Sequence, residues 1–128
     1  MRLLLGLIFV ATSGASIFRL MPAPASYPPQ ALAFAAALTA SGYLMATVWI
    51  VQLVSGVALL LDICTPLFLV VLAPITINIM LFHLFLTPHS MLTAGAPGIV
   101  VFLLNAALLW LYRASYAGML VVRARADV

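Results

Sequence analysis

Long apolar runs separated by short, breaker-rich segments are the main pattern along this chain. The runs cover residues 2–21, 30–61, 66–86 and 97–116. A helix needs about 20 apolar residues to cross a hydrocarbon core that is about 30 Å thick. The first, third and fourth runs each have the length of one such crossing. The pattern therefore predicts an all-α protein that is integral to a membrane.

The second run is too long for one straight crossing. At 1.5 Å per residue, residues 30–61 would form a helix about 48 Å long. We expect a break at the sequence ASGY (residues 40–43), because Gly42 is costly inside a helix. This break predicts a short Ala-rich helix on the non-cytoplasmic side, followed by a crossing at 44–61. Gly42 is thus assigned a structural role.

The start of the chain and the segment before the third crossing also contain recognisable sequence signals. Arg2, an apolar core and small residues at 11–15 are typical of a signal peptide, but the apolar run continues to Met21, a length that favours a retained first helix. The sequence DICTP (residues 62–66) predicts a tight turn between the second and third crossings. In that turn Thr65 would cap the next helix, and Pro66 would occupy its first position.

Composition supports the membrane assignment. Hydrophobic residues make up 67% of the chain and charged residues only 5%, whereas soluble domains carry about 25% charged residues. The net charge of +3 comes from scattered arginines, which form no basic stripe, so we expect no nucleic-acid partner. The single cysteine, Cys64, excludes an intrachain disulfide, a CxxC redox pair and a cysteine-based metal site.

The arginines also predict an orientation. Four would lie on one side of the membrane (Arg2, Arg113, Arg123 and Arg125) and Arg19 alone on the other. The positive-inside rule then places both termini in the cytoplasm. The prediction is a multi-pass protein of a bacterial inner membrane, in contact with the lipid bilayer.

Polar residues inside the apolar runs are the candidates for function, because such residues are costly in hydrocarbon. They are Thr12, Ser13, Ser16, Gln52, Ser55, Asn78, His83 and Asn105. Helix rise places four of them, namely Ser13, Gln52, Asn78 and Asn105, near mid-depth, which suggests one buried polar layer. Two interpretations stay open. The layer is either a set of interhelical hydrogen bonds, with Ser13 and Asn105 structural, or a ligand pocket.

His83 is the second candidate feature of the third crossing. Its depth is near that of Tyr43, and it lies about 140° around the helix from Asn78, so the two can line adjacent walls of one cavity. His83 can hydrogen-bond a quinone carbonyl, or it can be a neutral histidine bonded to a backbone carbonyl or to Tyr43. The other histidine, His89, follows in a loop, so neither haem ligation nor a metal site is expected within one chain.

Pro74 should kink the third crossing. It has no N–H to donate to the carbonyl of Val70. That free carbonyl can be part of a binding wall, or it can be satisfied by Gln52 from the neighbouring helix.

Three segments resemble the DoxX-like family of small bacterial membrane proteins. They are RLLLGLIF at the start, ASGYL before the second crossing, and LAPITINIMLFHLFL in the third. The last contains the most specific motif, formed by Pro74, Asn78, Phe82 and His83. The resemblance implies a four-helix bundle in the inner membrane. It also implies a link to quinone in some members, through thiosulfate oxidation, and to oxidative-stress complexes in others.

The chain departs from the family pattern at four positions. Ala15 and Arg19 stand where the family often has asparagine and histidine, and Trp49 and Gln52 where it often has lysine and glutamate. Gln52 can hydrogen-bond but cannot titrate. We therefore expect a non-catalytic accessory or structural subunit of a membrane complex, with a membrane-protein partner or a second copy.

The alternative function is a quinone- or lipid-binding redox component, with a pocket formed by His83, Asn78, Gln52 and Tyr43. A proton-coupled multidrug transporter is disfavoured, because it needs a carboxylate within the membrane and Asp62 lies at a helix end.

Overall fold

The computed structural model describes residues 1–18, 20, 27–90 and 96–118, apart from the side chain of Ser90. The described residues form helices and no strand, which confirms the all-α prediction. The elements are α1 (Arg2–Ile17), α2 (Pro29–Ala40), α3 (Leu44–Leu61), α4 (Thr65–Leu86), the 3-10 turn η1 (Pro88–Ser90), α5 (Ala96–Leu111) and the 3-10 turn η2 (Arg113–Tyr116). Arg19, Arg123 and Arg125 lie outside the described residues.

The break between α2 and α3 falls at the expected segment. Gly42 has φ +79, a left-handed conformation that glycine adopts at little cost, and it lies in the turn between α2 and α3. The predicted cap of α4 is wrong. Cys64 is the N-cap and Thr65 is already the first residue of the helix. The Thr65 hydroxyl accepts no hydrogen bond from an N–H of the described helix; it donates to Asp62 Oδ1 at 2.8 Å.

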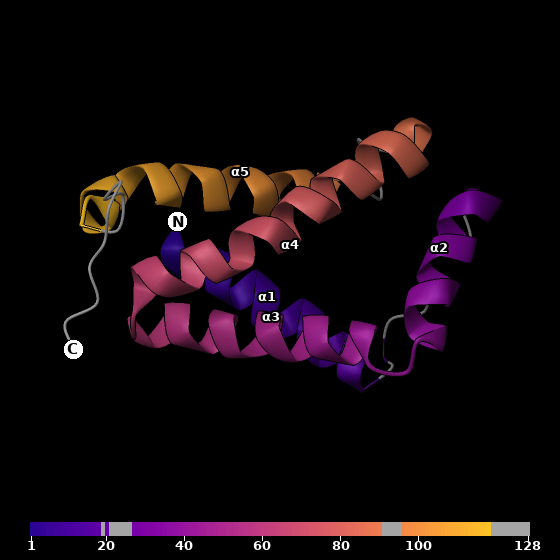
Figure 1. Cartoon of the computed structure of the whole chain (residues 1–128), viewed down its shortest axis with the longest axis horizontal. Coiled ribbons are helices and arrows are strands. Elements are labelled where there is room, and N and C mark those ends of the chain that lie inside the picture. The colour runs from indigo at the N-terminus through magenta and orange to yellow at the C-terminus, as the bar shows by residue number, and fades with distance from the viewer. Residues whose placement is uncertain (19, 21–26, 91–95, 119–128) are drawn as a thin grey trace, which may run out of the picture.

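The helices lie in a simple order (Figure 1). α1 packs along α3, α4 packs along α5, and α3 contacts α4 near the turn that joins them. The start of α1, the α3–α4 turn and the end of α5 lie at one end of the molecule. α3 and α4 diverge from that turn, and α2 stands across the opposite end, where it contacts both.

One core joins α1, α3, α4 and α5. Its fully packed members are Leu5, Phe9, Leu59, Leu69, Leu72, Val101 and Leu108. Outside this core the surface is strongly apolar. α3 and α4 are long and apolar enough to cross a membrane, and only 28% and 22% of the corresponding windows are buried. α1, α2 and α5 are apolar but shorter.

Two glycines bring the backbones of α1 and α3 close together. A Cβ built on Gly6 would lie 2.9 Å from the carbonyl oxygen of Gly56, and a Cβ on Gly56 would lie 3.0 Å from the carbonyl oxygen of Gly6. Real side chains essentially never approach backbone this closely. The distance between α1 and α3 is therefore set by the absence of side chains at both positions.

We predict that Gly6→Ala destabilises the protein and that Gly14→Ala on the same helix does not. The added methyl at position 6 must push α3 away, which costs about 1–3 kcal/mol. A methyl at position 14 meets no atom within 4 Å, so its helix propensity should stabilise by about 0.5–1 kcal/mol. Thermal unfolding of both variants in detergent measures the difference. Equal behaviour of the two variants would contradict the close α1–α3 contact.

An ion pair fastens the start of α1 to the α3–α4 turn. The Arg2 guanidinium contacts Asp62 Oδ1, which also accepts the Thr65 hydroxyl. These two hydrogen bonds, that from Arg2 first, lower the pKa of Asp62 below its ordinary value of 3.8. At the same end, the Tyr116 hydroxyl donates to the carbonyl of Pro66 at 3.0 Å, which ties η2 to α4.

The Asp62 interactions predict an acid-sensitive step in stability. Because the pKa of Asp62 is lower in the folded state, its stabilising contribution is complete above pH 3.8 and is lost as pH falls through the folded-state pKa. The midpoint of thermal unfolding should fall more steeply below about pH 4 in the wild type than in Asp62→Asn. Since the pair is exposed, salt should shrink the difference. Parallel pH profiles for the two proteins would rule out this role.

Candidate functional site

A cavity of about 310 Å³ lies where α3 and α4 diverge and α2 crosses them. We call it the central cavity. Its walls are mainly aliphatic and aromatic side chains of these three helices. Its polar side chains are Tyr27, Trp49, Gln52, Asn78 and His83. An apolar cavity with a few polar groups directed into it is typical of a site for a small organic ligand.

The central cavity brings together three of the four residues predicted as ligand-binding. Gln52 from α3 and Asn78 and His83 from α4 all line it. Tyr43 does not: it is the N-cap of α3, and 68% of its surface is exposed. Tyr27 supplies the tyrosine of the cavity instead. The sequence shows Tyr27 only as part of a proline-rich segment, and nothing in it indicates that this segment returns to α4.

His83 is held on one side of its ring. Its Nδ1 lies 3.0 Å from the Thr87 hydroxyl, rather than near Tyr43 or a neighbouring helix. The start of α5 packs against the edge of the ring that carries Nε2, because a Cβ on Gly98 would lie 2.6 Å from His83 Cδ2 and 3.0 Å from Nε2. Within the described part of the chain, no group hydrogen-bonds Nε2. Nε2 is thus the ring atom available to a ligand, as a donor in one tautomer and an acceptor in the other.

Gln52 and Asn78 also have unused hydrogen-bonding groups. Neither side-chain amide forms a hydrogen bond with another described residue, so the alternative in which Gln52 satisfies the carbonyl of Val70 is wrong. Gln52 is 9% exposed, whereas Asn78 lies at the outward edge of the cavity and is exposed. The predicted single buried layer is therefore incorrect for Asn78.

Asn105 and Ser13 are buried and satisfied away from the cavity. Asn105 Nδ2 donates to the carbonyl of Leu69 at 3.3 Å, and its Oδ1 accepts the Thr76 hydroxyl at 3.4 Å. Both partners belong to α4 and flank Pro74, through which that helix continues. Ser13 donates to the carbonyl of Phe9 within α1. These hydrogen bonds connect or stiffen helices and leave no group for a ligand.

Burial affects the tyrosine of the central cavity. It raises the pKa of Tyr27 above its ordinary value of 10.0. The phenol therefore stays protonated at neutral pH and can donate a hydrogen bond. Its ring is packed edge-on to His83, with centroids 6.4 Å apart, and also contacts Phe82 at 5.9 Å.

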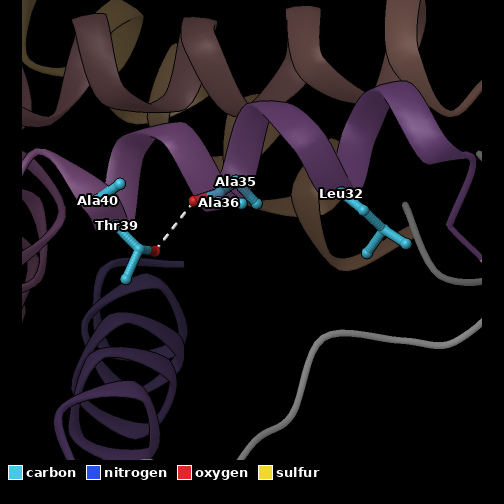
Figure 2. A pocket seen from close by; sticks show the side chains of 5 residues that line it. All are labelled: Leu32, Ala35, Ala36, Thr39 and Ala40. Atoms are coloured by element: carbon cyan, nitrogen blue, oxygen red, sulfur yellow. Dashed lines mark hydrogen bonds between the residues drawn. The ribbon is translucent and has the colours of Figure 1, made fainter.

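A larger hollow on the outer side of α2 is a weaker candidate. It has a volume of about 530 Å³, but all of its lining residues come from one helix: Leu32, Ala35, Ala36, Thr39 and Ala40 (Figure 2). Its one polar side chain is already paired, because the Thr39 hydroxyl donates to the carbonyl of Ala35 at 2.9 Å. The hollow is an open groove without free polar groups.

No protein-family model, curated protein or solved structure matches this chain. Among the described residues, no three His, Cys, Asp or Glu side chains gather in one place. What the central cavity offers a ligand is therefore apolar contact together with hydrogen bonds from Tyr27, Gln52, Asn78 and His83.

The different surroundings of the two buried amides predict different effects on stability. Asn105→Leu removes hydrogen bonds to Leu69 and Thr76, each worth about 0.6 and at most about 1.7 kcal/mol between membrane helices. Gln52→Met, which also replaces an amide by an apolar group of similar shape, breaks no hydrogen bond. Unfolding in detergent should therefore show a loss of stability for Asn105→Leu only. A comparable loss for Gln52→Met would show that Gln52 is structural.

Proposed function

We propose that the protein is integral to a membrane, with α1, α3, α4 and α5 crossing the bilayer as a four-helix bundle and α2 at the surface opposite the start of α1 and the end of α5. The outward-facing apolar side chains of α3 and α4 support this arrangement. α1 and α5 have 16 residues each, which corresponds to a length of about 24 Å. This is shorter than a hydrocarbon core of about 30 Å, and local thinning of the bilayer accommodates the difference. Arg2 and Arg113 lie at the same end, as expected for a cytoplasmic side.

We infer further that the central cavity binds a mostly apolar molecule with carbonyl or hydroxyl groups, such as a quinone or a lipid. The observation that carries this proposal is the set of unused hydrogen-bonding groups in one apolar cavity, on Gln52, Asn78 and His83. The side-chain amides of Gln52 and Asn78 and the Nε2 atom of His83 have no hydrogen-bond partner among the described residues, so they can bond a ligand without breaking an existing contact.

The donors and acceptors suit a quinone ring in particular. Its carbonyl oxygens accept hydrogen bonds, and the amides of Gln52 and Asn78 and the phenol of Tyr27 can donate them. His83 can donate or accept a hydrogen bond at Nε2, according to its tautomer. The resemblance to DoxX-like proteins, some of which are linked to quinone, points to the same ligand class.

One observation favours the accessory-subunit function instead. The outer groove of α2 is formed mainly by small residues (Figure 2). Small side chains let a second helix come close, as they do between helices within a membrane. On this hypothesis a partner protein would cover α2, and the central cavity would have no specific ligand.

The test is to purify tagged protein from native membranes in mild detergent and to identify by mass spectrometry which molecules remain bound. The measured quantity is the ratio of bound ligand to protein chain. We expect about one quinone or lipid per chain, as a single cavity of this kind holds one such molecule. His83→Ala should lose most of this ligand while remaining folded, because Nε2 is removed. His89→Ala is the matched control, since His89 is exposed and lines no described cavity. Equal ligand retention by both variants would refute the role of His83, and a stoichiometric protein partner without ligand would favour the accessory subunit.

A further inference from the structure

The central cavity continues at both of its ends. Toward α1 and α5 it adjoins an inner cavity of about 190 Å³, and the two share Gln52, Ile79 and His83. Toward the outside it adjoins a groove of about 170 Å³ on the surface of α4, which we call the α4 groove. The central cavity and the α4 groove share Phe34, Asn78 and Phe82. The three spaces thus follow one another from the middle of the four helices to the outer surface.

The chemistry of the walls changes along this series. Gln52 and His83 stand between the inner and central cavities, where their free polar atoms can reach either space. The rest of the α4 groove is formed by Leu81, Phe85 and Leu86, all apolar. Phe82 and Phe85 lie four and seven residues after Asn78, so the groove follows one face of α4 for about 10 Å.

Aromatic side chains lie in contact where the central cavity adjoins the α4 groove. Phe34 of α2 lies against Phe82 of α4 with ring centroids 5.9 Å apart, and Tyr27 contacts the same Phe82 ring at 5.9 Å. A molecule that extends from one space into the other must lie along these rings. Such a wall suits a hydrocarbon chain with double bonds or methyl branches, because it offers contact area without hydrogen bonds.

We propose that the ligand of this site carries a hydrocarbon chain, with its polar ring at Gln52 and His83 and its chain leaving past Phe34 and Phe82 along the α4 groove. The inference rests on the proposed function and narrows it to a ring with an attached isoprenoid chain. A cavity of 150 Å³ suffices to hold benzene, so the inner and central spaces have room for a six-membered ring with substituents. The apolar groove then receives the chain at the point where it would meet the acyl chains of the bilayer.

The experiment compares two probes on wild-type protein in lipid nanodiscs. One probe is a dimethoxy-methyl-benzoquinone without a chain, and the other is the same ring with a short isoprenoid chain. After correction for partitioning into empty nanodiscs, we expect the chain to lower Kd by about tenfold or more, because each buried CH₂ contributes to binding. His83→Ala should weaken both probes.

Variants of the groove locate the chain. Leu81→Trp fills the α4 groove and should abolish the preference for the chain, while leaving the Kd of the chainless ring unchanged. Leu103→Trp is the matched control, because Leu103 is 58% exposed on α5 and lines none of these spaces. Phe85→Ala removes contact area without adding bulk, and it should also reduce the preference if Leu81→Trp fails to fold.

Two results would overturn the inference in different ways. Equal Kd for both probes on the wild type, or a full preference for the chain in both groove variants, would show that the chain does not use the groove, while the ring site would stand. Failure of both probes to bind the wild type would remove the proposed quinone site and this inference with it.

Discussion

Hydrogen-bonding side chains have few possible partners in a chain that is 67% hydrophobic, and this shortage governs how the helices are arranged. Asn105 finds its hydrogen-bond partners, Leu69 and Thr76, across the α4–α5 contact. Ser13 finds its hydrogen-bond partner within its own helix. The groups that remain without a partner among the described residues of the cavity, on Gln52, Asn78 and His83, are gathered where the packing is open. For these residues, the distinction between structural and ligand-binding roles follows from which of them the helices already satisfy. Ser55 is an exception, because its buried hydroxyl has no partner among the described residues and it lines neither the central cavity nor the spaces beside it.

The cavity exists because two helix pairs are fixed at different places. α1 and α3 are held together by the mutual approach of Gly6 and Gly56, whereas α4 is fastened to α5 through Asn105. α3 and α4 meet closely only near their turn, where Asp62 is bonded to Arg2 and Thr65. Away from that end they diverge, and α2 covers the opening with Phe34 (Figure 1). A short surface helix thus forms the third wall of a partly open cavity between two helices.

The sequence was sufficient to predict the helices and half of the site. Breaks were readable at Gly42 and in the turn at residues 62–66, because glycine and proline act locally. Helix rise placed Gln52 near the depth of Asn78, and His83 farther out, near the depth of Tyr43. In the structure Gln52, Asn78 and His83 line one cavity. The sequence did not predict which side of each helix faces the cavity, or which distant segments of the chain lie next to α4. For this reason Tyr43 was chosen where the structure has Tyr27, and Asn78 was expected to be buried.

The contact between Gly98 and the imidazole of His83 has a consequence for sequence variation. A side chain at position 98 would overlap the ring, since even a Cβ there lies 2.6 Å from Cδ2. The two positions therefore share one small volume across the α4–α5 interface. In related chains we expect them to vary together: wherever histidine is kept at 83, glycine should be kept at 98, and a larger residue at 98 should appear only with a smaller one at 83.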